Sequence, residues 1–413
     1  MSNIKITTAQ FGARHNYAIP AAIAGRGQLD RFYTDACGTN GLGRLATLAA
    51  RFGVSKGGVA ALASRRPPPE VVSRTTTFDR FALKLRRALN RADPLTRLKI
   101  WDDATIEFGN LIERNGLGDT DVLYGVMHEL GPLYGMARAK GIKVAADVCV
   151  VPTWEARVRD EQERYPSWAA PQPQFSEALG SGIAPYRHMF GKLDLWVCPS
   201  KFVRDDLISN FGVPFDDTVV VPYAVADQWF QLEPRPQKGR ILFVGTANLR
   251  KGIHHFAKAA KELSKSGDSY DFRVAGAVSD DIRDREETRF LNFLGQIPRS
   301  EIHEEFQKAD VFVLPSIAEG SAGVTYEALA AGLPIVTTLA SGSVVSNGEE
   351  GFLCSQPHTQ ELAEAISSIV ADRGLRDAMS KKARKTAEGY SWECFQERLT
   401  NALNGLLETD IAT

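Results

Sequence analysis

Two glutamates in one short stretch, Glu319 and Glu327, carry the clearest chemical signal of the chain. A strand is predicted to end at Pro315, and a loop of small residues leads into a helix that starts near Gly323. Glycines let a backbone approach a ligand closely, and the free amides at a helix start favour phosphate. We expect Glu319 to meet a ligand at this loop while Glu327, about one turn into the helix, reaches past its end. The loop alone is equally compatible with an ordinary strand–loop–helix joint.

Two adjacent cations, Arg250 and Lys251, follow another predicted strand over residues 240–245 and precede a helix over residues 252–264. Positive charges at a helix start oppose the helix dipole unless an anion is bound there. A guanidinium can grip phosphate at two points, whereas an ammonium acts as a point charge. This pair therefore favours a phosphate site over two solvated charges.

Short apolar strands alternate with amphipathic helices along the chain, which is typical of parallel sheets covered on both faces. The polar segment 231–239, with two prolines and a glycine, is the best linker. We predict an α/β protein of two doubly wound, Rossmann-like domains, residues 1–232 and 240–390, and a helix over 391–413 that can cross back to the first domain. Ligands of open sheets bind at the carboxyl ends of the strands, so the domains should face each other across a cleft, with the linker as hinge.

The spacing of Glu319 and Glu327, followed by Ala-Leu-Ala-x-Gly-x-Pro, resembles the signature of the family 4 glycosyltransferases, which are retaining enzymes with the two-domain GT-B fold. The resemblance covers residues 194–395 well and the first domain only loosely. The further segments that carry it are 199–203, 244–252, 293–297 and 390–393. It implies a hexosyltransferase that uses a nucleotide sugar, with the acceptor bound by the first domain and the donor by the second.

The resemblance also implies roles for individual residues. Lys251 matches the lysine that neutralises the donor diphosphate, and Arg250 shares that task. Glu319 matches the residue near the hydroxyls of the donor sugar, and Glu327 matches the one that holds the ribose hydroxyls. The other implied donor-binding residues are Gly12 and Gly245 in turns after strands, Gln296 and Ile297 against the base, Ser321 in the loop, and Ala322, Gly323 and Val324 through their backbone amides.

The chain departs from the family pattern at three positions. The first glycine-rich loop keeps Gly12 alone, and Thr246 stands where the family often has an arginine. The family has a catalytic histidine at the end of a mid-domain strand. Asp147 stands at that place, while His128 ends the preceding strand, and either residue can occupy the cleft. These departures leave open a non-catalytic nucleotide-sugar binding protein. An NAD-dependent oxidoreductase is disfavoured because neither first strand precedes a G-x-G-x-x-G motif.

Composition limits the remaining classes of protein. The chain has 413 residues, 44% hydrophobic and 24% charged, with a net charge of −1, which excludes a disordered chain. No apolar run is long enough for a transmembrane helix, and the start does not resemble a signal peptide. Five scattered cysteines favour reduced thiols in a cytoplasmic protein over disulfides or a zinc site. We expect no metal and no cofactor besides the nucleotide-sugar substrate.

The near-zero net charge conceals a basic segment between Gly41 and Ile100, with 13 Lys and Arg against three acids. Within it, a helix over residues 78–89 places four apolar residues on one face. That face either lies on an anionic membrane or packs into the core. The membrane alternative predicts a peripheral protein on the inner membrane face, with a lipid-linked acceptor or a growing surface polysaccharide. Nucleic acid is disfavoured because the segment has too few aromatic residues for base stacking.

Overall fold

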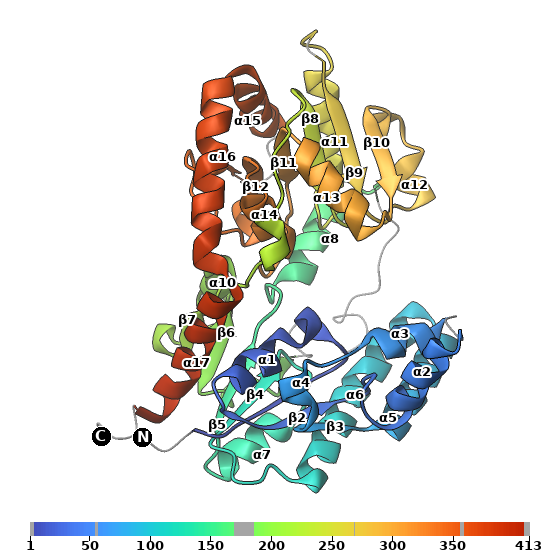
Figure 1. Ribbon diagram of the computed structural model, residues 1–413, viewed down its shortest axis with the longest axis vertical. Coiled ribbons are helices and arrows are strands. Elements are labelled where there is room, and N and C mark those ends of the chain that lie inside the picture. The colour runs from blue at the N-terminus through green and yellow to red at the C-terminus, as the bar shows by residue number, and fades with distance from the viewer. Residues whose placement is uncertain (1–3, 54–56, 169–185, 268, 356–358, 409–413) are drawn as a thin grey trace.

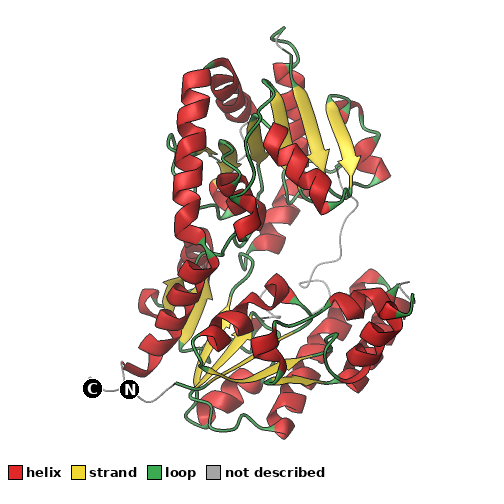
Figure 2. Cartoon of the chain, viewed as in Figure 1, coloured by secondary structure: helices red, strands yellow, loops and turns green. Residues whose placement is uncertain are grey.

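The computed structural model describes residues 4–53, 57–168, 186–267, 269–355 and 359–408. Two parallel sheets dominate these residues, and helices cover both faces of each sheet (Figures 1 and 2). The first sheet has seven strands in the order β3-β2-β1-β4-β5-β6-β7, and the second has six in the order β10-β9-β8-β11-β12-β13. Each order reverses direction beside its first strand, which is where doubly wound sheets bind their ligands.

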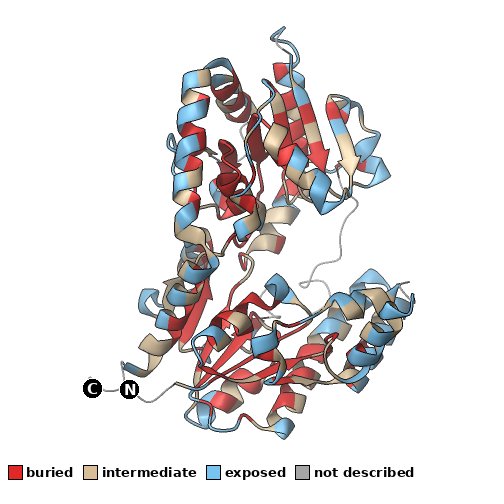
Figure 3. Ribbon diagram, in the orientation of Figure 1, coloured by how far each residue is buried: buried red, intermediate tan, exposed pale blue. Residues whose placement is uncertain are grey.

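The first domain is built from β1 (Ile6–Gln10), α1 (Ala18–Gly25), β2 (Leu29–Thr34), α2 (Gly41–Arg51), α3 (Gly58–Ser64), α4 (Pro69–Val72), β3 (Thr75–Thr77), α5 (Asp79–Arg91), α6 (Pro94–Asn115), β4 (Val122–Val126), α7 (Leu133–Ala139), β5 (Lys143–Asp147), α8 (Trp154–Arg164), β6 (Leu195–Cys198), α10 (Lys201–Phe211) and β7 (Thr218–Val220). The strands β1 and β4 are buried along their full length (Figure 3). Such burial on both faces explains the apolar sequence of β4, whereas β1 buries the polar side chains of Thr7, Thr8 and Gln10.

The second domain comprises β8 (Arg240–Val244), α11 (Ile253–Leu263), β9 (Asp271–Ala275), α12 (Asp280–Arg283), β10 (Leu291–Gly295), α13 (Arg299–Lys308), β11 (Val311–Leu314), α14 (Gly323–Ala330), β12 (Ile335–Thr338), β13 (Gly351–Cys354), α15 (Thr359–Ala371) and α16 (Arg373–Ala387). Its central strand β11 lies between β8 and β12. The loops that follow β8 and β11 therefore leave the sheet side by side.

The chain crosses between the domains more than once. The last helix, α17 (Trp392–Glu408), packs beside α1, and its Phe395, Leu399 and Leu403 belong to the core of the first domain (Figure 1). In the opposite direction, α8 leaves the first sheet and lies against the second domain, where Trp168 joins the second core. Each core therefore contains residues from the other side of the predicted boundary.

The predicted hinge at 231–239 belongs to the second domain. The amide of Arg235 donates to the carbonyl of Gln307 at 2.7 Å, and that of Gln237 donates to Lys308 at 2.9 Å. Trp229 and Leu232, which the sequence placed in the first domain, lie in the second core. Prolines and a glycine indicate irregular backbone. In the structure this irregular backbone packs along the end of α13. The segment is therefore packed against the second domain, and its role as a hinge stays a prediction.

The basic segment folds differently from the membrane alternative. In α5, Phe81 and Leu85 are buried and Leu89 packs against the same core, so the apolar face of this helix is covered. The core-packed alternative is correct for α5. The most exposed apolar side chains of the segment lie instead on α2 and just after it, where Leu45 is 62% and Phe52 81% accessible, although Leu83 of α5 is exposed as well.

No helix of the described residues is both long and apolar enough to cross a membrane. All five cysteines carry free thiols. Three of these, Cys37, Cys198 and Cys354, are buried and act as small apolar side chains.

Candidate active site

Glu319 and the two predicted cations meet at the carboxyl edge of the second sheet. The Glu319 Oε1 atom lies 2.7 Å from a guanidinium nitrogen of Arg250 and 2.7 Å from the Lys251 Nζ. The Lys251 side chain is well buried, which lowers the pKa of its ammonium, and Glu319 opposes that effect. One carboxylate thus holds two cations in place.

Two close backbone approaches bring these groups together. Gly252, in left-handed backbone at φ 75°, starts α11, and a Cβ there would lie 1.9 Å from the carbonyl oxygen of Pro315. Only glycine fits, because this contact joins the loop after β8 to the loop after β11. The two loops are also tied by the Ile317 amide, which donates to the Arg250 carbonyl at 2.9 Å.

The first domain contacts the Glu319 loop directly. A Cβ at Gly320 would lie 2.1 Å from the Cys149 carbonyl oxygen, so this glycine allows the two domains to touch. The Ser200 hydroxyl, which caps α10 by accepting from the Val203 amide, donates to the Gly320 carbonyl at 2.6 Å. The position of Glu319 therefore depends on both domains.

Two groups that were predicted to contact the donor, the Ser321 hydroxyl and the Ala322 amide, form hydrogen bonds within the protein instead. The Ser321 hydroxyl donates to the Gly342 carbonyl at 2.8 Å and lies 2.7 Å from the Tyr326 hydroxyl, so it shapes the loop. The Ala322 amide donates to the Ser341 carbonyl at 3.0 Å and is not available to a phosphate. Of the three predicted amides, those of Gly323 and Val324 have no hydrogen-bond partner among the described residues. They lie at the helix start, where an anion is favoured.

Glu327 lies on α14, and burial raises the pKa of its carboxyl to about 7, partly opposed by the positive charge of Arg299. Arg299 begins α13, immediately after the turn that holds Gln296 and Ile297. The structure therefore gathers the residues predicted for the ribose and the base along one stretch of the sheet edge. Gly245 ends β8 next to the Lys251 methylenes.

On the first-domain side, the loop after β1 is held by acids. The Gly12 amide donates to Asp35 Oδ1 at 2.7 Å, and Gly12 has a left-handed φ of 61°. Arg14 donates through Nε to Glu129 at 2.5 Å, and the same carboxylate accepts from the Phe11 amide at 2.8 Å. The ion pair with Glu129 fixes Arg14 at the cleft.

Of the two candidates for the missing histidine, His128 faces the cleft. It lines a cavity of about 420 Å³ with Arg14 from its own domain and with Arg250 and Glu319 from the other. Burial lowers the pKa of His128 to about 4, so the ring is neutral at pH 7. Met127 before it has a left-handed φ of 41°, a strain that is often found at functional sites.

Asp147 lies behind this cavity and is only 3% exposed. Burial raises the pKa of its carboxyl to about 7, and Arg14 partly opposes the shift. The cavity walls are completed by side chains that the sequence did not single out individually, Cys149, Trp154 and Tyr186. Tyr186 gave no signal because no motif surrounds it.

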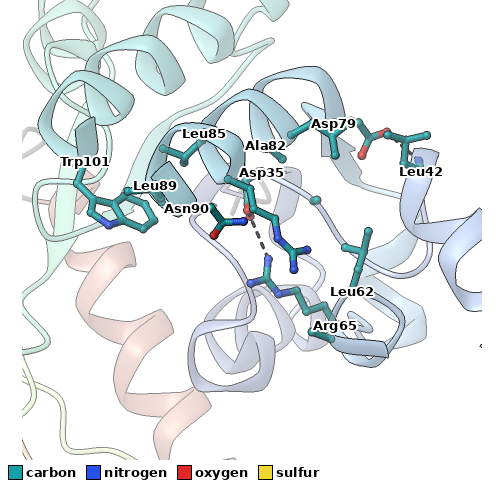
Figure 4. Close-up of a pocket in the computed structure, with 14 residues that line it drawn as sticks. Asp35, Leu42, Leu62, Arg65, Asp79, Ala82, Leu85, Leu89, Asn90 and Trp101 are labelled. Carbon is teal, nitrogen blue, oxygen red and sulfur yellow. Dashed lines mark hydrogen bonds and ion pairs between the residues drawn. The ribbon is translucent and has the colours of Figure 1, made fainter. Parts of the chain in front are cut away.

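A second cavity, of about 370 Å³, lies on the first domain between α2, α3, α5 and α6 (Figure 4). Leucine side chains and Trp101 form most of its wall, and Asp35, Arg65 and Arg86 supply charge. Arg65 pairs with Asp35 at 3.4 Å, the same aspartate that holds Gly12. This cavity and the reaction cleft therefore share one loop.

Comparison with known proteins agrees with this geometry. A model of the family described as glycosyl transferases group 1 matches residues 226–386. This stretch, which is less than half of the chain, is similar to a group 1 glycosyltransferase domain. The glycogen synthase of Mycobacterium tuberculosis is 27% identical over 212 residues, 48% of this chain and 51% of that protein. The D-inositol 3-phosphate glycosyltransferase of Paenarthrobacter aurescens is 29% identical over 230 residues, 49% of this chain and 56% of that protein. The chain spans about half the length of these curated relatives.

Solved structures resemble the whole chain. The sucrose-phosphate synthase of Thermosynechococcus elongatus has a TM-score of 0.66 at 15% identity, covering 98% of this chain and all of that one. WaaG, a glycosyltransferase involved in lipopolysaccharide biosynthesis, has a TM-score of 0.60 at 15% identity and covers 95% of this chain and 98% of its own. With two doubly wound sheets facing each other, the chain has the GT-B fold, as predicted, and the residues that match the group 1 model lie in its second half.

Proposed function

We propose that the protein is a retaining glycosyltransferase of family 4 that moves a hexosyl group from a nucleoside-diphosphate sugar to an acceptor hydroxyl. The observation that carries this proposal is the meeting of Arg250 and Glu319 in one cavity with His128 and Arg14 of the facing domain, with Lys251 paired to the same Glu319 carboxylate. The group 1 match over the second domain supports it. Retention follows from the resemblance to family 4.

In this account the donor diphosphate replaces Glu319 as the partner of the two cations. Negative charge grows on the diphosphate as the sugar departs, and Arg250, Lys251 and the amides at the start of α14 stabilise it. The displaced Glu319 carboxylate is then available to accept a hydrogen bond from a hydroxyl of the donor sugar. Neutral His128 offers a hydrogen bond to the sugar from the opposite wall.

The acceptor in this proposal is an amphiphile that is lipid-linked. The cavity next to Gly12 combines apolar walls with the guanidinium groups of Arg65 and Arg86, which suit an apolar chain that carries an anionic group (Figure 4). It opens beside α2, where exposed leucines alternate with Arg44 and Arg51. An anionic membrane surface fits this combination.

In this proposal the protein works in the cytoplasm, peripheral to the inner membrane face, in the synthesis of a surface polysaccharide or glycolipid. Relatives with such printed roles include the capsular polysaccharide biosynthesis glycosyltransferase CapM of Staphylococcus aureus, 29% identical over 176 residues, 40% of this chain and 46% of that protein. The structure of HepE from Anabaena, with UDP and glucose bound, has a TM-score of 0.57 at 14% identity, covering 97% of this chain and all of that one.

A thermal-stability screen tests the proposal. Nucleoside diphosphates and their sugars are added one at a time, because a ligand of the native state raises the melting temperature with its concentration. We expect one base to be preferred, and the matching nucleotide sugar to release nucleoside diphosphate slowly without acceptor. Binding without any release over a broad acceptor set would favour a non-catalytic binding protein, and no binding would overturn the proposal.

A further inference from the structure

Three side chains outside the reaction cleft converge on one point between the domains. Glu161 lies on α8, which comes from the first domain, and His254 and His255 lie at the start of α11 in the second. The Oε1 atom of Glu161 lies 2.7 Å from the Nε2 atoms of both histidines. All three potential ligand atoms lie within 4.8 Å of one another.

The cluster is buried to a degree that is unusual for polar groups. His254 and His255 are 0% and 2% exposed, and Glu161 is 3% exposed. The rings of Tyr165 and Trp168 pack against His254, with centroids 4.7 Å and 5.7 Å away. The Nδ1 atoms of both histidines have no hydrogen-bond partner among the described residues. Among the described residues, the Nε2 atoms of both rings therefore make their polar contact at the same place, the Glu161 carboxylate.

We propose that Glu161, His254 and His255 form a binding site for one divalent transition metal ion, with Zn²⁺ as the preferred ion. Two imidazole nitrogens and one carboxylate oxygen are a ligand set that Zn²⁺ accepts, with water in the fourth position. A neutral imidazole leaves one ring nitrogen able to bind a metal. No metal was expected from the sequence, in which the two neighbouring histidines lie 93 and 94 residues from Glu161.

The location of the cluster gives the ion a structural task. His254 follows Lys251 by one helical turn, so an ion here would fix α8 against the helix that begins at the two cations. The start of α8, Trp154, lines the reaction cavity. Two cations lie near the cluster, Lys258 over the Tyr165 ring and Arg164 at 3.5 Å from Glu161. An ion bound at the cluster would connect α8 to α11, and so join the two walls of the active site without touching the donor.

The test uses the full chain, stripped with a chelator, and Zn²⁺ or Co²⁺ alone as the probe. We expect one ion per chain by elemental analysis after dialysis. We also expect a melting temperature that rises with Zn²⁺ concentration, and a Co²⁺ absorption spectrum of four-coordinate type. Glu161→Gln and His255→Asn should each lower the affinity by more than about tenfold. His188→Asn, which removes a histidine of the first domain away from the cluster, should bind the ion as the unmodified protein does.

Loss of the hydrogen bonds to Glu161 can itself lower stability, so the comparison is the increment caused by metal within each variant. A wild-type protein that gains no stability from Zn²⁺ and holds no ion would overturn the proposal, and the cluster would then be a hydrogen-bonded contact alone. Equal binding by Glu161→Gln and the wild type would also overturn it. Both results are independent of nucleotide binding and of transferase activity.

Discussion

The change that probes the site most deeply is Glu319→Gln. In the ligand-free protein the Glu319 carboxylate neutralises both Arg250 and Lys251, and a donor diphosphate must displace it. The amide keeps the shape of the side chain but removes its charge. We therefore expect nucleoside diphosphates to bind more tightly to the variant, whereas sugar transfer is lost.

The size of the effect follows from the contacts. A hydrogen bond to a charged group contributes about 1.5–3 kcal/mol. The Arg250 side chain is 31% exposed, so solvent screens its part, while Lys251 at 14% is better protected. A net gain of about 1.4 kcal/mol, or about tenfold in affinity, is expected for the diphosphate. The loss of one contact to the reacting sugar should lower kcat by about 10²–10³.

Calorimetric titration with nucleoside diphosphate and with free nucleoside, followed by kinetics with the donor, measures both quantities. The nucleoside is the internal control, because it does not reach the cations and its affinity should not change. The free variant should also be less stable by about 1–3 kcal/mol, since two partly buried cations lose their partner, and diphosphate should restore part of that stability. A tenfold loss of diphosphate affinity, or unchanged transfer, would refute this description of Glu319.

Four further predictions concern the second domain and the exposed leucines of α2. Arg250→Ala and Lys251→Ala should each weaken nucleoside diphosphate binding and leave the free nucleoside unaffected in calorimetry; an equal loss for both ligands would show that the cations do not address the phosphates. Nucleoside affinity should rise with pH through about 7, because burial raises the pKa of Glu327 to about 7 and only the carboxylate accepts two ribose hydroxyls. Glu327→Gln should remove this pH dependence, and an unchanged pH profile in that variant would misplace the carboxylate. Because the folded pKa of Glu327 lies above its ordinary value, the free protein should lose stability as pH rises from about 4.5 to 7, a loss absent from Glu327→Gln. The double change Leu45→Ser, Leu48→Ser on α2 should reduce sedimentation with anionic vesicles but not with neutral ones; sedimentation that ignores lipid charge and both substitutions would leave α2 an ordinary exposed helix.

Much of the fold follows from patterns that are local in sequence. The strands β8 and β11 and the helix α14 lie within one or two residues of their predicted positions, because buried apolar runs and small-residue loops mark them directly. Domain boundaries are harder to predict, since they depend on which core a segment joins. The prolines of segment 231–239 disfavour a helix both in a hinge and in a segment packed along α13. They therefore do not distinguish the two.

The residues of the site likewise fall into those that the sequence predicts and those that it does not. The convergence of Glu319 with Arg250 and Lys251 was predictable because adjacent parallel strands end at one edge, and the residues after those ends must be neighbours. The use of Ser321 and Ala322 inside the loop was not, since a hydroxyl or amide can bond to protein or ligand with no difference in sequence. The choice between His128 and Asp147 depended on which side chain faces the cavity. Glu161 could not be linked to the histidines because they lie 93 residues or more away.

The central claim is that Arg250, Lys251 and Glu319 bind a donor diphosphate for sugar transfer with retained configuration. The most direct measurement is proton NMR of the reaction with the nucleotide sugar that stabilises the protein most, followed through the anomeric signal of the product. The account predicts a product with the anomeric configuration of the donor, formed by the wild type and not by Lys251→Ala. Inverted product, or equal turnover by Lys251→Ala, would contradict it.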